Sequence, residues 1–127
     1  MRAYIDSDIL IWHLRGERRA AGLLRKISQE GSAELWIGAL QRAEVVFFMR
    51  GDEIPATMSF LSRFKTQPVT QEVVDKAGQL YRKWRPTHGI DINDAILAAT
   101  VMVTGGKIYT LNRKHYPMPD LVVTRGW

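Results

Sequence analysis

Three acidic residues, far apart in the sequence, lie in apolar surroundings where a carboxylate is costly to bury. Asp6 directly follows a short apolar run, Glu44 lies within an apolar segment that we expect to be largely buried, and Asp94 opens a third apolar segment. A buried charge destabilises a fold unless it is paired, hydrogen-bonded or bound to a metal ion. For Glu44, the neighbouring Arg42 and Arg50 are the alternative to a metal. We therefore expect each of the three acids to have a defined partner.

Four polar residues close to these acids could complete a site: Ser7, Asp8, Asp91 and Asn112. Three of them have a structural alternative. Asp8 could cap a helix or lie in its first turn, Asp91 could form a reciprocal capping arrangement with Asp94, and Asn112 could form a turn. Ser7 could donate a hydrogen bond to a ligand or to water, so we treat it as a candidate substrate-binding residue.

Carboxylates that converge on one crevice repel each other and stay ionised when a cation holds them together. The chain has no cysteine and only three widely spaced histidines. Oxygen ligands without cysteine or clustered histidine favour Mg²⁺ or Mn²⁺ over Zn²⁺. Such an ion suits phosphodiester hydrolysis, because it lowers the pKa of a bound water and neutralises phosphate charge. The chain also has more Lys and Arg than Asp and Glu, for a net charge of +5. Together with this basic charge, the acids predict a metal-dependent nuclease.

The length of 127 residues predicts a single domain spanning 1–127. The net charge of +5 favours a polyanionic partner, nucleic acid first and an anionic membrane second, although it could serve solubility alone. The absence of cysteine excludes disulfides and a thiolate nucleophile. Acidic residues interrupt the apolar start of the chain, and its apolar segments are too short to span a bilayer. We expect a cytoplasmic protein that does not enter a membrane.

Short apolar runs alternate with helical patterns along the chain. The patterns predict helices over 9–14, 18–30, 39–49, 54–64, 71–84 and 91–103. They predict strands over 3–5, 35–37, around residue 69, and over 107–110 and 121–123. Pro86 and Gly89 are expected to break the fifth helix. This alternation indicates a three-layer α/β fold with a mostly parallel sheet of four to five strands flanked by helices. In such sheets the functional crevice lies beyond the carboxyl ends of the strands.

Four segments of the sequence, 4–11, 43–45, 92–100 and 109–116, resemble the PIN domain. More narrowly, they are similar to the VapC toxins of toxin–antitoxin pairs. Each segment is weakly specific alone, but together they cover essentially the whole chain in the family's order. The resemblance implies a PIN-like fold and a Mg²⁺- or Mn²⁺-dependent endoribonuclease. It also implies a homodimer and a VapB-type antitoxin that lies across the acidic groove.

The resemblance assigns the family's metal-binding and catalytic acids to Asp6, Glu44 and Asp94. The family's fourth acid commonly follows the fourth strand, and that position holds Asn112 here. An amide oxygen can ligate a hard cation, but it lowers the negative charge of the pocket. Asp91 or Asp8 could compensate for the missing charge. The RNA that is cleaved is not apparent from the sequence.

Three other functions are compatible with parts of the sequence. The departure at Asn112 allows a PIN-fold protein that binds RNA without cleaving it. The pair Asp6 and Asp8 is also similar to the opening of haloacid-dehalogenase-type phosphatases, but that family does not account for Glu44 and usually has Thr or Val where Leu10 stands. A receiver-like binding module would need an acid at the end of the third strand, and none is present there.

Overall fold

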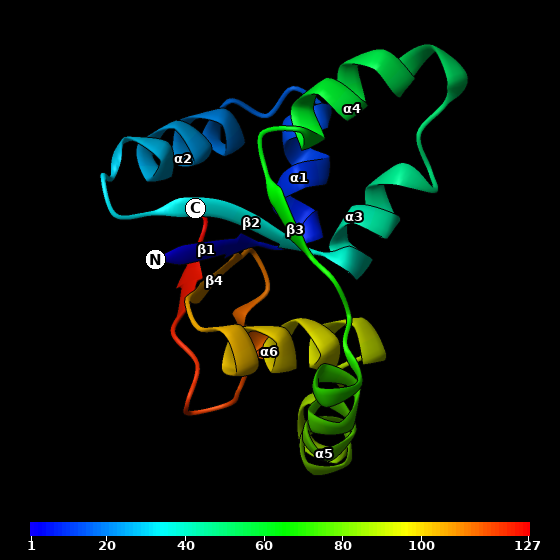
Figure 1. The fold of residues 1–127 in the computed structure, drawn as a ribbon, viewed down its shortest axis with the longest axis vertical. Helices are drawn as coiled ribbons and strands as arrows, with labels where there is room; N and C mark the ends of the chain where they lie inside the picture. Colours follow the sequence, from blue (N-terminus) through cyan, green and yellow to red (C-terminus); the bar gives the residue numbers. More distant parts are fainter.

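The computed structural model describes residues 1–127 and contains one sheet of five parallel strands in the order β3-β2-β1-β4-β5 (Figure 1). The strands are β1 (Arg2–Ile5), β2 (Glu34–Gly38), β3 (Lys65–Gln67), β4 (Lys107–Thr110) and β5 (Val123–Arg125). Parallel strands need crossover connections, and helices supply most of them here. The first strand lies at the centre of the sheet, so its carboxyl end lies between neighbouring strand ends.

Helices cover both faces of the sheet in three layers (Figure 1). The six α-helices are α1 (Ser7–Leu14), α2 (Arg18–Gln29), α3 (Ala39–Val46), α4 (Ile54–Leu61), α5 (Gln71–His88) and α6 (Ile92–Thr104). In Figure 1, α1, α2 and α4 lie on one side of the sheet and α5 and α6 lie on the other. Short 3₁₀ turns occupy Gly51–Glu53 and Arg113–His115. None of the helices combines the length and apolar character needed to cross a membrane.

The pairing of β1 with β4 determines which residues meet beyond the sheet. Ile5 pairs with Tyr109, so the residues that follow each of them come out at the same edge. At the opposite end of this pair, Gly106 has a φ of +106°, and a Cβ added there would lie 2.9 Å from Cβ of Arg2. A side chain at that position would be strained and crowded, so glycine allows the two strands to start side by side.

The core consists of two apolar clusters, one on each face of the sheet. Ala3 and Ile5 point into the cluster beneath α1 and α2, whereas Tyr4 points into the cluster beneath α5 and α6. All three side chains are fully buried. A central strand buried on both faces reads as a continuous apolar run rather than an alternating one, and this is the pattern that ends at Asp6.

The predicted α/β architecture with a parallel sheet is confirmed, and several element boundaries were wrong. The third strand is Lys65–Gln67 rather than a strand around Val69, and the last is Val123–Arg125 rather than 121–123. The fifth helix continues through Pro86 and ends at Gly89, whose φ of +62° is favourable for glycine. The remaining predicted helices differ from the observed ones by one to three residues at an end.

The helix that carries Glu44 differs from its prediction in a way that affects the site. It ends at Val46 rather than at residue 49, and only Gln41 and Val45 along it are buried. Phe47 is 79% exposed and Phe48 is 81% exposed. The expectation that this apolar segment is largely buried is therefore wrong, and the cost of burial at Glu44 is smaller than the sequence suggested.

Candidate active site

Asp6 lies at the end of β1 and is 9% exposed. Its Oδ1 accepts a hydrogen bond from the backbone N–H of Ser7 at 2.9 Å, an interaction that caps α1. Its Oδ2 accepts from the hydroxyl of Thr110 at 2.9 Å and from the hydroxyl of Tyr116 at 2.8 Å. Three donors from α1, β4 and the segment after β4 therefore hold one buried carboxylate in place.

Asp94 lies in the first turn of α6 and faces the same tyrosine. The hydroxyl of Tyr116 lies 3.4 Å from Oδ1 of Asp94, longer than its 2.8 Å hydrogen bond to Asp6. Oδ2 of Asp94 lies 3.0 Å from Nδ1 of His115 and accepts the backbone N–H of Asp91 at 3.0 Å. One tyrosine hydroxyl thus contacts both carboxylates, and a histidine can pair with the second of them.

Glu44 reaches the same region from α3. Its Oε2 accepts a hydrogen bond from the hydroxyl of Ser7 at 2.9 Å, and its Oε1 accepts from the side-chain amide of Asn93 at 3.1 Å. Ser7 and Asn93 are sequence neighbours of Asp6 and Asp94. Neither Arg42 nor Arg50 pairs with Glu44, so the basic partners considered from the sequence are wrong.

The carboxylates of this site protonate more readily than exposed ones. Burial raises the pKa of Asp6, and burial followed by the nearby charge of Asp6 raises the pKa of Glu44 against the hydrogen bond from Ser7. Burial also raises the pKa of Asp94 to about 6. Burial and the charge of Asp6 raise the pKa of Tyr116 well above its ordinary value, so its hydroxyl stays a donor. Carboxylates that raise one another's pKa are close enough to attract a cation.

Asp8 and Asp91, the weaker candidates from the sequence, make structural hydrogen bonds. Asp8 accepts the backbone N–H groups of Ile9 at 2.7 Å and Leu111 at 3.0 Å, and so ties the start of α1 to the end of β4. Asp91 caps α6, and its Oδ1 accepts the backbone N–H of Asp94 at 2.7 Å. This is the reciprocal capping arrangement that the spacing of the two acids indicated. The helix cap therefore uses Asp94 as well as Asp91.

Asn112 lies beside the acids without touching them. Its side-chain nitrogen is 3.2 Å from Nδ1 of His115, and its backbone N–H donates to the hydroxyl of Thr110 at 3.1 Å. His115 in turn is the partner of Asp94. Asn112 and Asp94 thus approach the same nitrogen atom of His115, and Asn112 precedes the 3₁₀ turn Arg113–His115.

Sequence reasoning assigned no role to Thr110, Tyr116 or Asn93, although each donates a hydrogen bond to one of the three acids. Thr110 and Tyr116 carried a usable signal. A buried hydroxyl must find a partner, and both residues follow or end apolar strand patterns next to the predicted crevice. For Asn93, its place directly before Asp94 is the only indication in the sequence.

The donor set of the site fits a hard divalent cation, because it consists of carboxylate, hydroxyl and amide oxygens. As the side chains stand, however, no three acidic or histidine groups surround one point closely enough to hold a single ion. The carboxylates are engaged by Tyr116, Ser7 and Asn93 instead. Binding of an ion would have to exchange some of these hydrogen bonds for metal ligation.

Comparison with known proteins identifies close relatives. A sequence model of the PIN domain family matches residues 3–121. Ribonuclease VapC19 of Mycobacterium tuberculosis is 38% identical over 119 residues, which are 92% of this chain and 94% of that protein. Ribonuclease VapC10 of the same organism is 36% identical over 115 residues, 90% of this chain and 85% of that one. A toxin–antitoxin complex from Klebsiella pneumoniae contains a chain with the same fold, with a TM-score of 0.81, 21% identity and 98% of each chain covered.

The pKa of Asp8, which burial and the charge of Asp6 raise to about 6, predicts how stability varies with pH. Between pH 3.8 and about 6 the folded state binds more protons at this group than the unfolded state does. Its contribution to the free energy of unfolding is therefore present at low pH and is lost as pH rises through about 6. Asp8→Asn lacks this titration, so the difference in the free energy of unfolding between the variant and the unmodified protein should shift in favour of the variant as pH rises from about 4 to 7. Urea unfolding in EDTA measures this difference. Parallel stability profiles would contradict the prediction.

Removal of the Tyr116 hydroxyl should destabilise the protein, because it takes a 2.8 Å donor away from a buried carboxylate. Loss of a hydrogen bond to a charged group costs about 1.5–3 kcal/mol. We expect Tyr116→Phe to lower the free energy of unfolding by about that amount at neutral pH, measured by urea denaturation. Tyr81→Phe is the matched control, because Tyr81 is half-buried and, unlike Tyr116, its hydroxyl donates to no carboxylate. Equal effects of the two substitutions would show that the hydroxyl of Tyr116 does not stabilise Asp6.

Proposed function

This chain belongs to the PIN domain family, and from that membership and the geometry of its acidic site we propose that it is a divalent-metal-dependent endoribonuclease. The observation that carries the proposal is the meeting of Asp6 and Asp94 at one tyrosine hydroxyl, with Glu44 hydrogen-bonded to the sequence neighbours of both. Two relatives that match most of the chain are named ribonucleases.

We assign Asp6, Glu44 and Asp94 as the groups that would hold the cation and act in catalysis. They come from the end of β1, from α3 and from the start of α6, and their oxygens suit Mg²⁺ or Mn²⁺. When bound, such an ion would polarise the phosphate and lower the pKa of an attacking water. Asp8 and Asp91 are weaker candidates, because each is already used to join or cap helices.

The chain's own residues prepare this chemistry by fixing the carboxylates. Tyr116 and Thr110 fix the position of Asp6, and Ser7 fixes Glu44. His115 lies against Asp94 at 3.0 Å and can offset its negative charge when protonated. Because Ser7 is buried and bonded to Glu44, we propose that it positions this acid rather than contacting substrate through a free hydroxyl.

The phosphatase alternative is not supported by these contacts. It requires Asp8 as a general acid facing substrate, whereas Asp8 accepts the backbone N–H of Leu111. A PIN protein that binds RNA without cleaving it would have the same fold, and it would differ only in that its acids do not catalyse hydrolysis. Mutation of the acids therefore tests the proposed catalytic role directly.

We also propose that the chain is the toxin of a toxin–antitoxin pair and forms a homodimer. A groove between α1, α3 and α4 is lined by apolar side chains that include Ile11, Leu14 and Phe48, and Glu44 lies in its wall. An antitoxin segment with apolar side chains and a basic group would complement this groove, and the basic group would reach Glu44 and the neighbouring acids. Phe48 and its sequence neighbour Phe47 are both largely exposed, which supports the assignment, because contiguous exposed apolar surface marks sites of contact with a partner.

Substitution of the site acids should abolish cleavage without unfolding the protein. Asp6→Asn and Asp94→Asn keep the shape of the side chain and remove a ligand charge. We expect RNA cleavage in Mn²⁺ to fall roughly 10²-fold or more in each variant. Gel analysis of labelled RNA measures the loss, and circular dichroism checks the fold. Cleavage at the original rate in both variants would refute the assignment of the acids.

Replacement of Asn112 tests whether this position belongs to the metal site. If its amide stands in for a fourth acid, Asn112→Asp should tighten Mn²⁺ binding and Asn112→Ala should weaken it. If Asn112 only starts the turn that carries His115, neither change should alter metal affinity, and Asn112→Ala should lower stability instead. Calorimetric titration of Mn²⁺ separates the two. Equal dissociation constants for all three proteins would remove Asn112 from the site.

Substitution in the apolar groove should weaken the antitoxin complex and spare the nuclease. We expect Phe48→Ser to lower the affinity for the proposed VapB-type antitoxin, measured by calorimetry, and to leave RNA cleavage by the free toxin unchanged. Val74→Ser is the control, since Val74 is an exposed apolar residue on α5, outside the groove. Equal affinity of Phe48→Ser and the control for the antitoxin would contradict the proposed docking site. Light scattering of the free protein tests the homodimer.

A further inference from the structure

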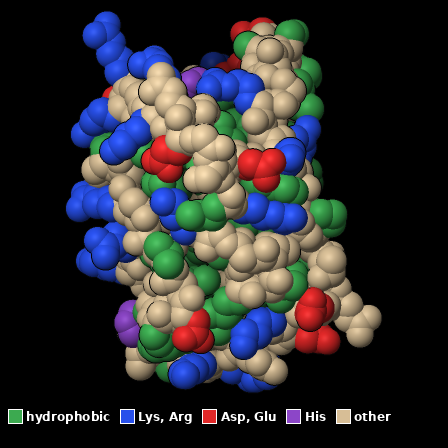
Figure 2. Space-filling view, turned by 60° about the vertical axis from the view of Figure 1, so that its left-hand side comes forward, with side chains coloured by type: hydrophobic (Ala, Val, Ile, Leu, Met, Phe, Trp, Pro, Cys, Tyr) green, Lys and Arg blue, Asp and Glu red, His purple; other side chains and the backbone are tan.

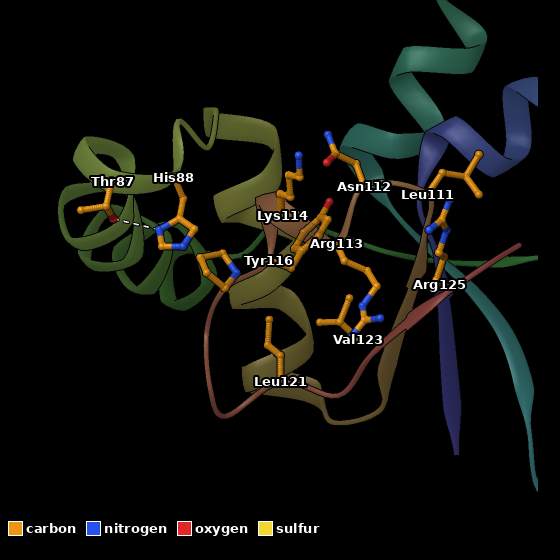
Figure 3. Close-up of a pocket in the computed structure, with 11 residues that line it drawn as sticks. Thr87, His88, Leu111, Asn112, Arg113, Lys114, Tyr116, Leu121, Val123 and Arg125 are labelled. Atoms are coloured by element: carbon orange, nitrogen blue, oxygen red, sulfur yellow. Dashed lines mark hydrogen bonds between the residues drawn. The ribbon is translucent and has the colours of Figure 1, made fainter.

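A basic hollow lies beside the acidic site, on the side of β4 and β5. Its volume is about 1020 Å³, and it lies between the end of α5, the segment after β4, and β5. Its charged lining is entirely basic and consists of Arg113, Lys114 and Arg125, with His88 at the end of α5. No acidic side chain lines it. Figure 3 shows these residues around the hollow, with Arg113 extending alongside Val123.

The three cations of this hollow are available to a ligand. Arg113, Lys114 and Arg125 are all exposed, and none forms a salt bridge with an acidic side chain. Nε of Arg125 donates to the backbone oxygen of Trp127 at 2.8 Å, and its two Nη groups make no hydrogen bond. Other basic side chains are partly committed, since Arg19 pairs with Glu17 and Lys65 pairs with Glu34. Three cations without an acidic side-chain partner, around one concave surface, form a site suited to several phosphates.

Basic charge alone does not single out the hollow, because Lys and Arg side chains also cover other parts of the surface. Figure 2 shows them from top to bottom of one face of the molecule. The distinguishing feature is position. Tyr116 and Asn112 line the hollow, and Tyr116 also donates its hydroxyl to Asp6. The side chain of Tyr116 therefore joins the hollow to the carboxylate of Asp6, and a nucleic-acid strand lying in the hollow would come close to the acids.

We infer that this hollow binds the backbone phosphates of single-stranded RNA on one side of the cleaved bond, through Arg113, Lys114 and Arg125. The inference rests on the proposed nuclease function, which supplies the bond to be cleaved. The cations attract the strand that the neighbouring carboxylates repel, and so hold the scissile phosphate against a site of the same charge. The lining also has an apolar part, which includes Leu121 and Val123 and can pack against the sugar and base of a bound nucleotide.

The matched variants for the test carry the same loss of charge at two places. One is Arg113→Gln, Lys114→Gln and Arg125→Gln together. The control is a triple Gln substitution on α2, which does not line the hollow, at three basic residues without a salt bridge: Arg18, Arg25 and Lys26. The control also tests whether the basic face of α2 contacts RNA. Because all six residues are exposed, we expect both proteins to fold, and the double variant Arg113→Gln with Lys114→Gln is the substitute if the first triple does not.

Binding is measured by fluorescence anisotropy of a short labelled RNA in EDTA, where metal-dependent cleavage cannot occur, over a range of KCl concentrations. For a single strand, each phosphate contact contributes about 0.7 to the slope of log K against log salt concentration. Loss of the three cations should therefore reduce the magnitude of this slope by about 2. Its affinity at low salt should fall roughly tenfold or more. The α2 variant should stay close to the unmodified protein. Equal losses in the two variants, or no loss in the hollow variant, would overturn the inference.

Cleavage of the same RNA in Mn²⁺ separates this inference from the proposed function. If the unmodified protein cleaves RNA while both triple variants bind RNA alike, the hollow is not the binding site and the nuclease assignment stands. If the protein binds RNA through the hollow but does not cleave it with any divalent metal ion, the nuclease assignment fails and the binding site stands. If it neither binds nor cleaves RNA, both fail. For an active nuclease, the hollow variant should raise KM more than it lowers kcat, because it removes binding shared by ground and transition states.

Discussion

The carboxylate of Asp6 is the constraint on which the site depends, because it is nearly buried and follows a strand whose last three residues are fully buried. Its stability requires three donors, from Ser7, Thr110 and Tyr116, which belong to three separate elements. The donors meet the carboxylate only when β1 and β4 pair in their observed register. A shift by one residue would turn Thr110 to the other face of the sheet. The hydrogen bonds that assemble the sheet thus also assemble the acidic site.

Sequence patterns predicted the central strand that ends at Asp6, but they misplaced the strands at the two edges of the sheet. A continuous apolar run ending in an acid marks a central parallel strand, and it correctly placed Asp6 beyond the sheet. The edge strand Lys65–Gln67 has no apolar residue, so it forms by pairing with β2 and carries little local signal. Proline usually ends a helix, but α5 continues past Pro86 through Thr87 and His88 and stops only at Gly89.

The convergence of the three acids could be predicted from the sequence, whereas the residues that donate hydrogen bonds to them could not. Asp6 and Asp94 stand where apolar patterns begin or end, a signal that the sequence carries locally. Tyr116 reaches them only through the turn that follows β4, so its role depends on tertiary structure. The burial argument for Glu44 was wrong for a related reason. An apolar helix end such as the one at Phe48 has the same local pattern whether it is buried or exposed for a partner.

The 3₁₀ turn Arg113–His115 separates the two kinds of charge on this edge of the molecule. Its first two residues send basic side chains to the hollow, while His115 and the following Tyr116 turn inward to the carboxylates. In a turn of about three residues per revolution, successive side chains point about 120° apart, so neighbours can face different surroundings. The same short segment can thus place donors on the acids and leave cations free beside them. That placement matters for a polyanion, because the attraction of the hollow acts next to the carboxylates whose charge the strand must approach.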